Sequence, residues 1–398
     1  MTDLHTPAPA PDGAVTLAGA DPRAAGDAAR GAGRSRCPVA RTADGSWVLL
    51  GHAEVRDAAL DDAAFSSTVS AHLQLPNGLD GAEHTRWRTL VDRYFTPAEV
   101  QRLRGPFEDA ARAVVAEYLG RTDAVAELGR RMAVRLMTVW LGWPRELEDE
   151  LLDWMDQNQA ATRSGDPART RAVAERFDAI IRSVVGPRRA AAERGEAPAD
   201  PDVTDRLIAD DSLGRPLTDE EIVSVLRNWT AGDLGSLARC LGVVVHRIAE
   251  DPALQERLRA GVTEAELAGV VDECLRVDDP FVANRRVAAR DVTVAGTTIA
   301  AGERVLLHWT AANRDAEAFG PDADAFDPSG HAADNLVWGV GRHVCPGRPL
   351  ATLELCVAVT ALLEATGQIR RDEERPAERG EHPVGGWRRL PVLLEPAA

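Results

Sequence analysis

The sequence predicts a mainly α-helical fold, a helix-rich single domain with small β-sheets on one side. Residues 97–250 are dominated by Ala, Leu, Arg and Glu in an almost wholly helical pattern. Short alternating apolar segments before and after this stretch, at residues 47–50 and 292–299, predict strands. No change of composition marks a boundary, so residues 36–398 are expected to form one domain.

The composition excludes several classes of protein. The formal net charge is −17 and the isoelectric point is about 5.0, which argues against a nucleic-acid partner. The chain has no run of about 18 apolar residues, and its first residues lack the charged-then-apolar order of an export signal. A cytoplasmic protein without a membrane anchor is therefore expected. The five cysteines form no C-x-x-C pair, which disfavours a zinc site or a disulfide framework.

The N-terminal segment, residues 1–35, is expected to be disordered because it is small, polar and proline-bearing without periodicity. A strand at residues 47–50 and a short helix at 53–60 follow. Residues 65–83 contain Ser, Thr, Pro, Asn and Gly without helical periodicity and predict a long loop. Loops of that length inside a compact domain are usually functional or mobile.

A further helix is expected to open at His84. His84 and Arg88 are four residues apart, so they fall on one face of that helix. Two positive groups on one face can bind two anionic groups. A solvated, charged helix face would produce the same pattern, and the pair alone does not separate these interpretations.

A long helix is predicted from Thr218, which with Glu221 resembles a capping box. Its apolar pattern contains Gly232 and Gly235 in the middle. Each interior glycine costs up to about 1 kcal/mol relative to alanine. The pair therefore indicates either close approach to a flat ligand or packing against another helix through small residues.

The C-terminal third carries two weaker signals. Glu273 and Arg276 form an E-x-x-R pattern, which occurs by chance in many helices. The alternation of Val292, Val294 and Ile299 predicts a strand–turn–strand unit.

The most specific stretch is Leu-Val-Trp-Gly-Val-Gly-Arg-His-Val-Cys-Pro-Gly-Arg-Pro-Leu-Ala at residues 336–351. One cysteine, Cys345, lies in a glycine-punctuated loop that runs straight into an apolar helical pattern. Such a loop can present a single axial thiolate to a flat ligand, with amides at the helix start bonding the sulfur. A buried structural cysteine at a helix start is the alternative.

This loop resembles the haem loop of the cytochrome P450 family, Phe-Gly-x-Gly-x-His/Arg-x-Cys-x-Gly, with Trp338 in place of Phe. The resemblance covers about residues 38–395 and implies the cytochrome P450 fold, haem b as cofactor and Cys345 as the proximal iron ligand. It implies haem contacts by His84, Arg88, Ala231, Gly232, Arg286, Trp338, Gly339 and His343.

The same resemblance implies a substrate pocket and a core ion pair. The loop at 65–83 would cover the substrate, and the last hairpin, at 385–392, would touch it. The implied or suspected substrate contacts are Trp229, Phe281, Val282, Ala283 and Trp387. Glu273 and Arg276 would form a buried hydrogen-bonded pair. The usual third, arginine partner is Gly330 here, and a usual propionate histidine is Asn335.

The helix predicted from Thr218 corresponds to the helix on the distal, oxygen-binding side of the haem in the family. It departs from the family pattern Ala-Gly-x-Asp/Glu-Thr-Thr/Ser. Leu234 stands where the acid belongs, and Gly235 stands where the first threonine belongs. In the family, the acid and the alcohol help to relay protons during oxygen activation. Asp233, Ser236, an ordered water or a polar substrate group could substitute, which makes Asp233, Gly235 and Ser236 the candidate catalytic positions.

Three functions follow as hypotheses. The leading one is an oxygen- and ferredoxin-dependent oxidoreductase that performs oxidative C–C or C–N coupling on an aromatic or indole-containing cyclodipeptide or short peptide. The second is hydroxylation of a small natural-product intermediate, and the third is haem binding without turnover. A ferredoxin-type donor is expected because the chain lacks a flavin or nicotinamide domain, and Arg342 and Arg348 could form its docking site or be ordinary solvated arginines.

Overall fold

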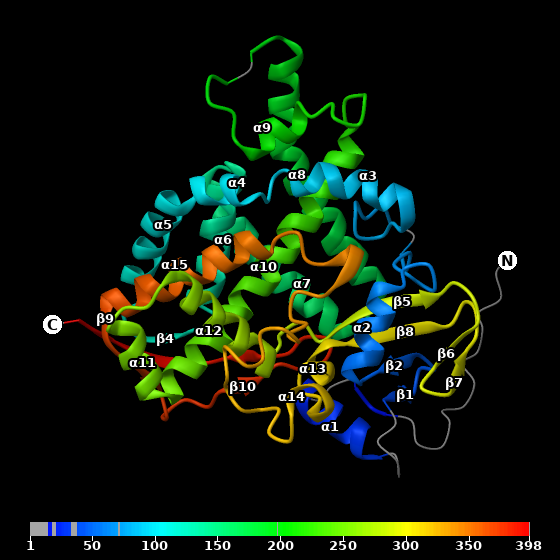
Figure 1. Ribbon diagram of the computed structural model, residues 1–398. Coiled ribbons are helices and arrows are strands. Elements are labelled where there is room, and N and C mark those ends of the chain that lie inside the picture. The colour runs from blue at the N-terminus through cyan, green and yellow to red at the C-terminus, as the bar shows by residue number, and fades with distance from the viewer. Residues whose placement is uncertain (1–14, 18–20, 33–37, 71, 197, 398) are drawn as a thin grey trace.

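The computed structural model describes residues 15–17, 21–32, 38–70, 72–196 and 198–397. Helices fill the centre and one side of the molecule, and the largest β-sheet lies on the other side (Figure 1). The predicted mainly α-helical fold with small sheets on one side is confirmed. No helix in the described part of the chain is long and apolar enough to cross a membrane.

The helices begin and end close to the sequence signals. They are α1 (Pro22–Ala32), α2 (His52–Leu60), α3 (Gly81–Asp92), α4 (Pro97–Arg102), α5 (Arg104–Glu117), α6 (Leu128–Leu141), α7 (Glu148–Ser164), α8 (Pro167–Glu193), α9 (Val203–Ile208), α10 (Asp219–Glu250), α11 (Pro252–Arg259), α12 (Glu264–Val277), α13 (Trp309–Ala312), α14 (Ala316–Phe319) and α15 (Arg348–Ala365), with 3-10 turns η1 (Arg145–Leu147) and η2 (Gly341–His343).

Helix α10 is the central element and crosses the middle of the molecule (Figure 1). The predicted capping box is present: the Glu221 amide donates to the Thr218 side chain, and the Thr218 amide donates to Glu221. Such caps satisfy amides that the first helical turn leaves unpaired. Helix α10 packs against α6 and α15, which encloses its middle turns.

The strands form four small sheets. The largest has the order β1-β2-β8-β5-β3, with β2 and β8 parallel and the other pairs antiparallel. The others are β4-β12-β9, β6-β7 and β10-β11. The bounds are β1 (Val39–Arg41), β2 (Trp47–Leu49), β3 (Phe65–Ser66), β4 (Gly120–Asp123), β5 (Ala283–Ala288), β6 (Val292–Val294), β7 (Thr297–Ile299), β8 (Arg304–His308), β9 (Thr366–Arg371), β10 (Glu378–Arg379), β11 (Trp387–Arg389) and β12 (Pro391–Pro396).

Residues 385–392 do not form one hairpin. Strand β11 pairs with β10, whereas β12 pairs with β4 and β9. The chain therefore passes from one sheet to another at Leu390, whose side chain is fully buried. A hairpin is present nearby, but it joins β10 to β11.

The expectation of disorder across residues 1–35 is wrong for residues 22–32, which form α1. Ala25 and Ala29 lie on one face of α1 and are buried with Val48, Leu50 and Ala311. A face made of alanines is small, so the apolar period is hard to distinguish from a low-complexity segment. Residues 1–14, 18–20 and 33–35 lie outside the described part of the chain.

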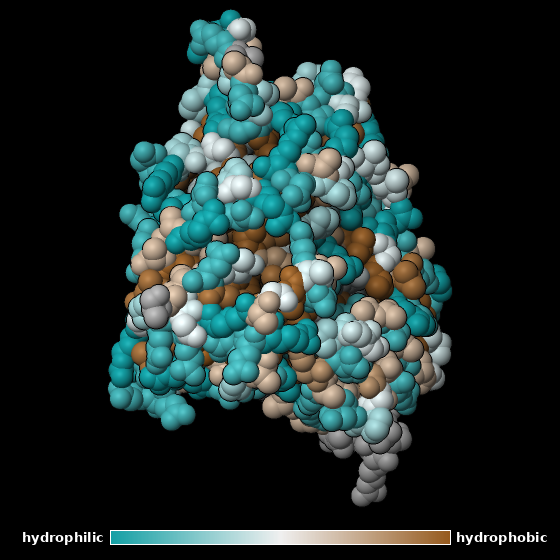
Figure 2. All heavy atoms as spheres, turned by 60° about the vertical axis from the view of Figure 1, so that its left-hand side comes forward, coloured by the Kyte–Doolittle hydropathy of each residue, from teal (hydrophilic) through white to brown (hydrophobic). Residues whose placement is uncertain are grey.

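The visible surface is largely hydrophilic. In the face shown in Figure 2, hydrophilic residues dominate the protruding surface, and apolar residues are visible mainly in recesses across the middle. The α8–α9 region projects from the body at the top of Figure 1. There Arg188 forms ion pairs with Asp202 and Asp205, at 2.6 and 3.1 Å, which fasten α9 to α8.

Candidate active site

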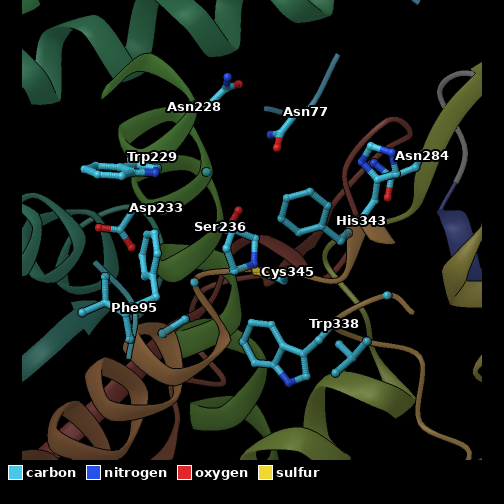
Figure 3. A pocket seen from close by; sticks show the side chains of 18 of the residues that line it. Asn77, Phe95, Asn228, Trp229, Asp233, Ser236, Asn284, Trp338, His343 and Cys345 are labelled. Atoms are coloured by element: carbon cyan, nitrogen blue, oxygen red, sulfur yellow. The ribbon is translucent and has the colours of Figure 1, made fainter. Parts of the chain in front are cut away.

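A cavity of about 310 Å³ lies between α10 and the cysteine loop (Figure 3). Its wall combines aromatic side chains, amides, acids and the thiols of Cys240 and Cys345. Among the expected site residues, the wall includes Trp229, Gly232, Asp233, Ser236, Phe281, Arg286, Trp338, Gly339, His343 and Cys345. The sequence therefore identified residues from three separate segments, 229–236, 281–286 and 338–345, that fold into one place.

The loop geometry presents Cys345 to this cavity. The Cys345 amide donates to the Trp338 carbonyl at 2.8 Å, which closes the loop around η2. Burial raises the pKa of the Cys345 thiol, and the amides of Gly347 and Arg348 at the start of α15 oppose that rise by bonding the sulfur. The predicted amide contacts at the helix start are present.

Gly341 is needed for the packing of this loop. Its φ is 73°, a conformation that side-chain-bearing residues rarely adopt. A Cβ there would lie 3.0 Å from Leu60 Cδ2 and 3.1 Å from the Ala59 carbonyl oxygen. Glycine at this position lets the loop pack directly on the end of α2.

Basic side chains gather at one edge of the cavity. His343 and the buried Arg286 line the cavity, whereas His84 does not, and the His84 ring lies 4.2 Å from the His343 ring between centroids. Burial, with His343 and Arg88 nearby, lowers the pKa of His84 to about 4. His84 Nδ1 is buried and has no hydrogen-bond partner among the described residues. This edge is suited to an anionic group that would restore the lost solvation.

Arg88 lies outside the cavity wall and braces the cysteine loop. Its Nη1 donates to the carbonyls of Arg342 and Val344 at 3.1 and 2.7 Å, and its Nε pairs with Asp92. The solvated-face interpretation of the His84 and Arg88 pair is therefore wrong, because His84 is 1% exposed and Arg88 is bonded to the loop.

The distal helix presents only part of its expected residues to the cavity. Gly232, Asp233 and Ser236 belong to the wall, whereas Ala231 and Gly235 do not. Adjacent helical residues differ by about 100° around the axis, so Gly235 and Ser236 cannot share a direction. A Cβ on Gly232 would meet nothing within 4 Å, and on Gly235 only Arg239 Nη1 at 3.9 Å. Packing of these two glycines against another helix is thereby excluded within the described residues.

The residues present fit a haem. The Cys345 thiol lies in the cavity wall, and Gly232 permits close approach of a flat group from α10. His84 Nδ1 is a buried polar atom without a partner, and the guanidinium of the buried Arg286 can donate to a carboxylate at this edge. When bound, haem supplies oxygen activation and electron transfer, which these side chains cannot perform alone.

Comparisons with known proteins decide the family. Residues 163–366 match the family model described as Cytochrome P450. The chain is 30% identical over 372 residues to the erythromycin C-12 hydroxylase of Saccharopolyspora erythraea, which covers 90% of this chain and 92% of the relative. The chain belongs to the cytochrome P450 family.

Two further matches agree with this membership. The cyclomarin C epoxidase CymV of Salinispora arenicola is 29% identical over 336 residues, covering 81% of this chain and 84% of the relative. A solved structure of a mutant of P450 EryK in complex with erythromycin B has a TM-score of 0.81 at 29% identity, covering 95% of this chain and 98% of that one. The chain is thus an oxidoreductase with the cytochrome P450 fold, and the family implies a haem-thiolate cofactor.

An aromatic cluster that includes Trp229 forms one wall of the cavity in this cytochrome P450. The Trp229 ring lies 5.5 Å from Phe95 and 5.3 Å from Trp140 between centroids, and all three line the cavity. In Figure 3, Trp229 and Asp233 lie on the Phe95 side of α10, whereas Ser236 lies on the side of Cys345. Trp140 was not expected from sequence, because nothing in its helix distinguishes it from ordinary core.

Three expected substrate contacts are corrected by the structure. Phe281 lines the cavity, but Val282 is fully buried and points the other way, as alternation along an extended chain requires. Ala283 pairs with His308 at the start of β5 and is not part of the wall. Trp387 packs on His246 with centroids 4.5 Å apart and under Arg379, away from the cavity, because β11 lies against the C-terminal half of α10.

The expected core pair of this cytochrome P450 is present with an unforeseen partner. Arg276 donates from Nε and Nη2 to the two oxygens of Glu273, each at 2.8 Å, and Arg276 is fully buried. His331 Nδ1 lies 2.7 Å from Glu273 Oε1. His331 therefore fills the place left open by Gly330. Asn335 has a local role, since its side chain donates to the Asp272 carbonyl and accepts from the Val337 amide.

Sequence reasoning missed Glu354 of α15, which also lines the cavity. It is a lone acid at a buried position of an otherwise apolar helical pattern, and that contrast is a usable signal. Of the two arginines considered for donor docking, Arg342 is paired with Asp62 at 2.7 Å, and Arg348 with Asp272 at 2.9 Å. The side chain of Arg348 is 54% exposed, so it is the more accessible of the two.

Proposed function

We propose that this chain is a haem b-dependent monooxygenase of natural-product biosynthesis that oxidises an aromatic small molecule. Cys345 is the proposed iron ligand, and His84, Arg286 and His343 are the proposed partners of the haem carboxylates, with Arg88 holding the loop. The observation that carries this proposal is the Cys345 thiol in the wall of a cavity that also contains Gly232 of α10.

The cavity wall favours an aromatic substrate. Phe95, Trp229 and Phe281 offer ring faces and edges for stacking. Phe281 is 47% exposed, an unusual state for a large apolar side chain that a bound ligand would cover. Asn77 and Asn228 add amide groups to the same wall, so a substrate with N–H or C=O groups, such as a small peptide, suits the site.

Oxygen insertion is the reaction that the observations support best. The two named relatives are a hydroxylase and an epoxidase, and both reactions add one oxygen atom. Ser236 lies on the Cys345 side of α10 and offers an alcohol one residue beyond the position at which the family carries its first threonine. A hydroxyl there can orient a water for proton transfer.

Oxidative coupling of an aromatic or indole-containing cyclodipeptide or short peptide is the second candidate. Leu234 is fully buried and Gly235 lacks a side chain, so the usual acid and first alcohol are absent from the cavity wall. A substrate that provides its own N–H or O–H proton would need neither group. Such a reaction removes two hydrogens and adds no oxygen.

The test uses haem-loaded protein, oxygen, a ferredoxin with its reductase, and a panel of aromatic cyclodipeptides, short Trp and Tyr peptides and polyketide intermediates. A product that gains one oxygen supports monooxygenation, and one that loses two hydrogens supports coupling. Cys345→Ser should abolish both, whereas Cys356→Ser, a buried thiol on α15, should retain them. A protein that binds ligands and accepts electrons without forming any product would overturn both reactions and favour haem binding without turnover.

The donor and the location complete the proposal. A ferredoxin-type donor is proposed to dock near Arg348 on the side of the cysteine loop away from the cavity, and the enzyme is proposed to be cytoplasmic, as the single domain of residues 36–398. Arg348→Glu should raise the ferredoxin concentration needed for half-maximal electron transfer, and this effect should shrink at high salt.

A further inference from the structure

Two adjacent aspartates follow α12, and they differ in their partners. Asp278 accepts hydrogen bonds from Arg379 at both carboxylate oxygens, at 2.5 and 2.7 Å. Asp279 accepts one from the Phe281 amide at Oδ1, at 2.7 Å, but its Oδ2 is buried and has no partner among the described residues. Asp279 is 1% exposed and lines the cavity, whereas Asp278 does not line it. The acid without a counterion is therefore the one in the cavity wall.

A negative charge on Asp279 is costly in the empty cavity. Burial raises the pKa of this carboxyl well above its ordinary value; the Phe281 amide and the Asn313 side chain oppose the rise, and the neighbouring Asp278 adds to it. An opposite charge at contact distance stabilises the ionised form of a carboxyl and lowers its pKa. A positively charged ligand in the cavity would supply that charge to Asp279.

The charges on the cavity wall divide unevenly. Its basic side chains among the described residues are Arg286 and His343, which are the proposed partners of the haem carboxylates. Its acids are Asp233, Asp279 and Glu354. Once the two basic groups hold the haem carboxylates, the described part of the wall has no further basic side chain to offset these acids. The space left for the substrate therefore favours a positive charge over a negative one.

Aromatic side chains accompany Asp279 in the wall. Phe281 follows two residues later and is 47% exposed, and its backbone is fixed by a bridge to Val384. Trp309 also lines the cavity, and its Nε1 donates to Asn284 Oδ1 of β5 at 2.6 Å. Aromatic ring faces attract organic cations. An acid beside such rings suits a protonated amine attached to an apolar body better than it suits a neutral group.

We propose that Asp279 is a specificity-determining residue that binds a protonated amine of the substrate. This inference rests on the proposed function and narrows its substrate class to an aromatic small molecule or short peptide with a basic nitrogen. The carboxylate of Asp279 accepts a hydrogen bond from the amine, and Phe281 covers the apolar part of the ligand next to it. A linear peptide carries such an amine at its N-terminus, whereas a cyclodipeptide without a basic side chain does not.

Ligand binding to the haem-loaded protein tests this assignment without turnover. Tryptamine and tryptophol share an indole ring and a two-carbon chain, but tryptamine ends in an ammonium group and tryptophol in a neutral hydroxyl group. In calorimetric titrations of wild type, the dissociation constant of tryptamine should be at least about tenfold lower than that of tryptophol, the size expected for one buried hydrogen bond between charged groups. Equal binding of the two compounds by wild type would overturn the proposal.

Two adjacent substitutions locate the preference. Asp279→Asn keeps the size of the side chain and removes its charge, so the preference for tryptamine should disappear. Asp278→Asn is the matched control and should keep the preference, because Asp278 is paired with Arg379 and lies outside the cavity wall. Coordination of the amine by the haem iron would persist in Asp279→Asn. A preference that survives in Asp279→Asn would therefore overturn the role of this carboxylate.

Urea unfolding separates ligand binding from a structural role of Asp279. A buried acid without a counterion destabilises the empty protein, so the urea midpoint of Asp279→Asn should equal or exceed that of wild type. A lower midpoint together with an unchanged preference for tryptamine would overturn the proposal and assign Asp279 to the core. If asparagine is not accommodated, Asp279→Ser provides the same comparison, because its hydroxyl can still accept from the Phe281 amide.

The binding result is independent of the reaction. A protein that binds tryptamine through Asp279 and forms no product from any amine would contradict the proposed function and support this inference. A protein that oxidises neutral aromatic compounds and does not prefer tryptamine over tryptophol would support the proposed function and overturn this inference. The two failures are therefore distinguishable.

Discussion

Trp338 donates a hydrogen bond from Nε1 to Oδ1 of Asp272 at 2.7 Å. Arg348 donates to the second oxygen of the same carboxylate at 2.9 Å. Trp338 precedes Cys345 in the chain and Arg348 follows it, so Asp272 of α12 holds both sides of the cysteine loop. The tryptophan that replaces the family's phenylalanine thus has a definite partner, which phenylalanine could not bond.

Trp338→Phe should loosen the loop without unfolding the protein. Without the indole N–H, Oδ1 of Asp272 loses its donor. The expected loss in the free energy of unfolding is about 1–2 kcal/mol. The expected result is faster release of haem to an acceptor protein and a small drop in the urea midpoint. Trp143→Phe is the control, because Trp143 Nε1 donates to Thr204 Oγ1 at 3.0 Å far from the loop. Equal haem release from the two variants would contradict the assignment.

The buried triad of Glu273, Arg276 and His331 should matter for folding. Arg276→Leu leaves Glu273 as an uncompensated buried charge, so a loss of about 3–5 kcal/mol in the free energy of unfolding is expected. His331→Ala removes one partner and should cost about 1–3 kcal/mol. Urea unfolding measures both. Arg290→Ala, which breaks an exposed pair with Asp61 at 3.5 Å, should stay within about 0.5 kcal/mol; a comparable loss there would show that ion pairing in general sets the stability.

These examples show which features a sequence can predict. The capping box at Thr218 and the Glu273–Arg276 pair depend on residues three positions apart on one helix, so spacing alone defines them. His331 lies 58 residues from Glu273 and enters the triad only because the chain folds back. No local pattern identifies it, and the loss of arginine at Gly330 gave only the hint that another group was required.

The site residues also divide into those that local sequence predicts and those that depend on how the chain folds. The cysteine loop and the Gly232 stretch were predictable because glycine and cysteine carry strong local constraints. The prediction that Trp387 contacts the substrate was wrong because the sheet that a strand joins depends on long-range pairing. The same prediction for Val282 was wrong because the sequence does not show which alternate residues of the strand face the cavity. Glu354 was missed although a lone acid at a buried position of an apolar helix is a usable local signal.

The titration of His84 should report whether haem carboxylates bind at the basic edge of the cavity. The pKa of His84 is lowered to about 4, and the unfolded value is near 6.5. Between these values the unfolded chain binds more protons, so the stability from neutral His84 is present above about pH 6.5 and is lost as the pH falls to 4. Haem carboxylates beside the ring should raise this pKa, and two-dimensional NMR of labelled histidine with and without haem measures the change.

His246 provides the matched control for that titration. Burial also lowers its pKa to about 4, but it packs against Trp387 away from the cavity. Its titration should not move when haem binds. A shift of both histidines would indicate a global change in packing, and a shift of neither would contradict the placement of the haem carboxylates near His84.

Ser236→Ala and Gly235→Thr should separate the face of α10 that serves the reaction from the face that does not. Ser236 lines the cavity, whereas a side chain at Gly235 would grow toward Arg239, with 3.9 Å from Cβ to Nη1 as its nearest contact. Ser236→Ala should therefore lower product per electron several-fold, within the range of lost proton-transfer assistance. Gly235→Thr should fold normally and leave the ratio near wild type, even though it restores the family's threonine in sequence. An increase of product per electron in Gly235→Thr would contradict this assignment. It would mean that α10 rotates by about one residue when haem binds, so that position 235 faces the cavity.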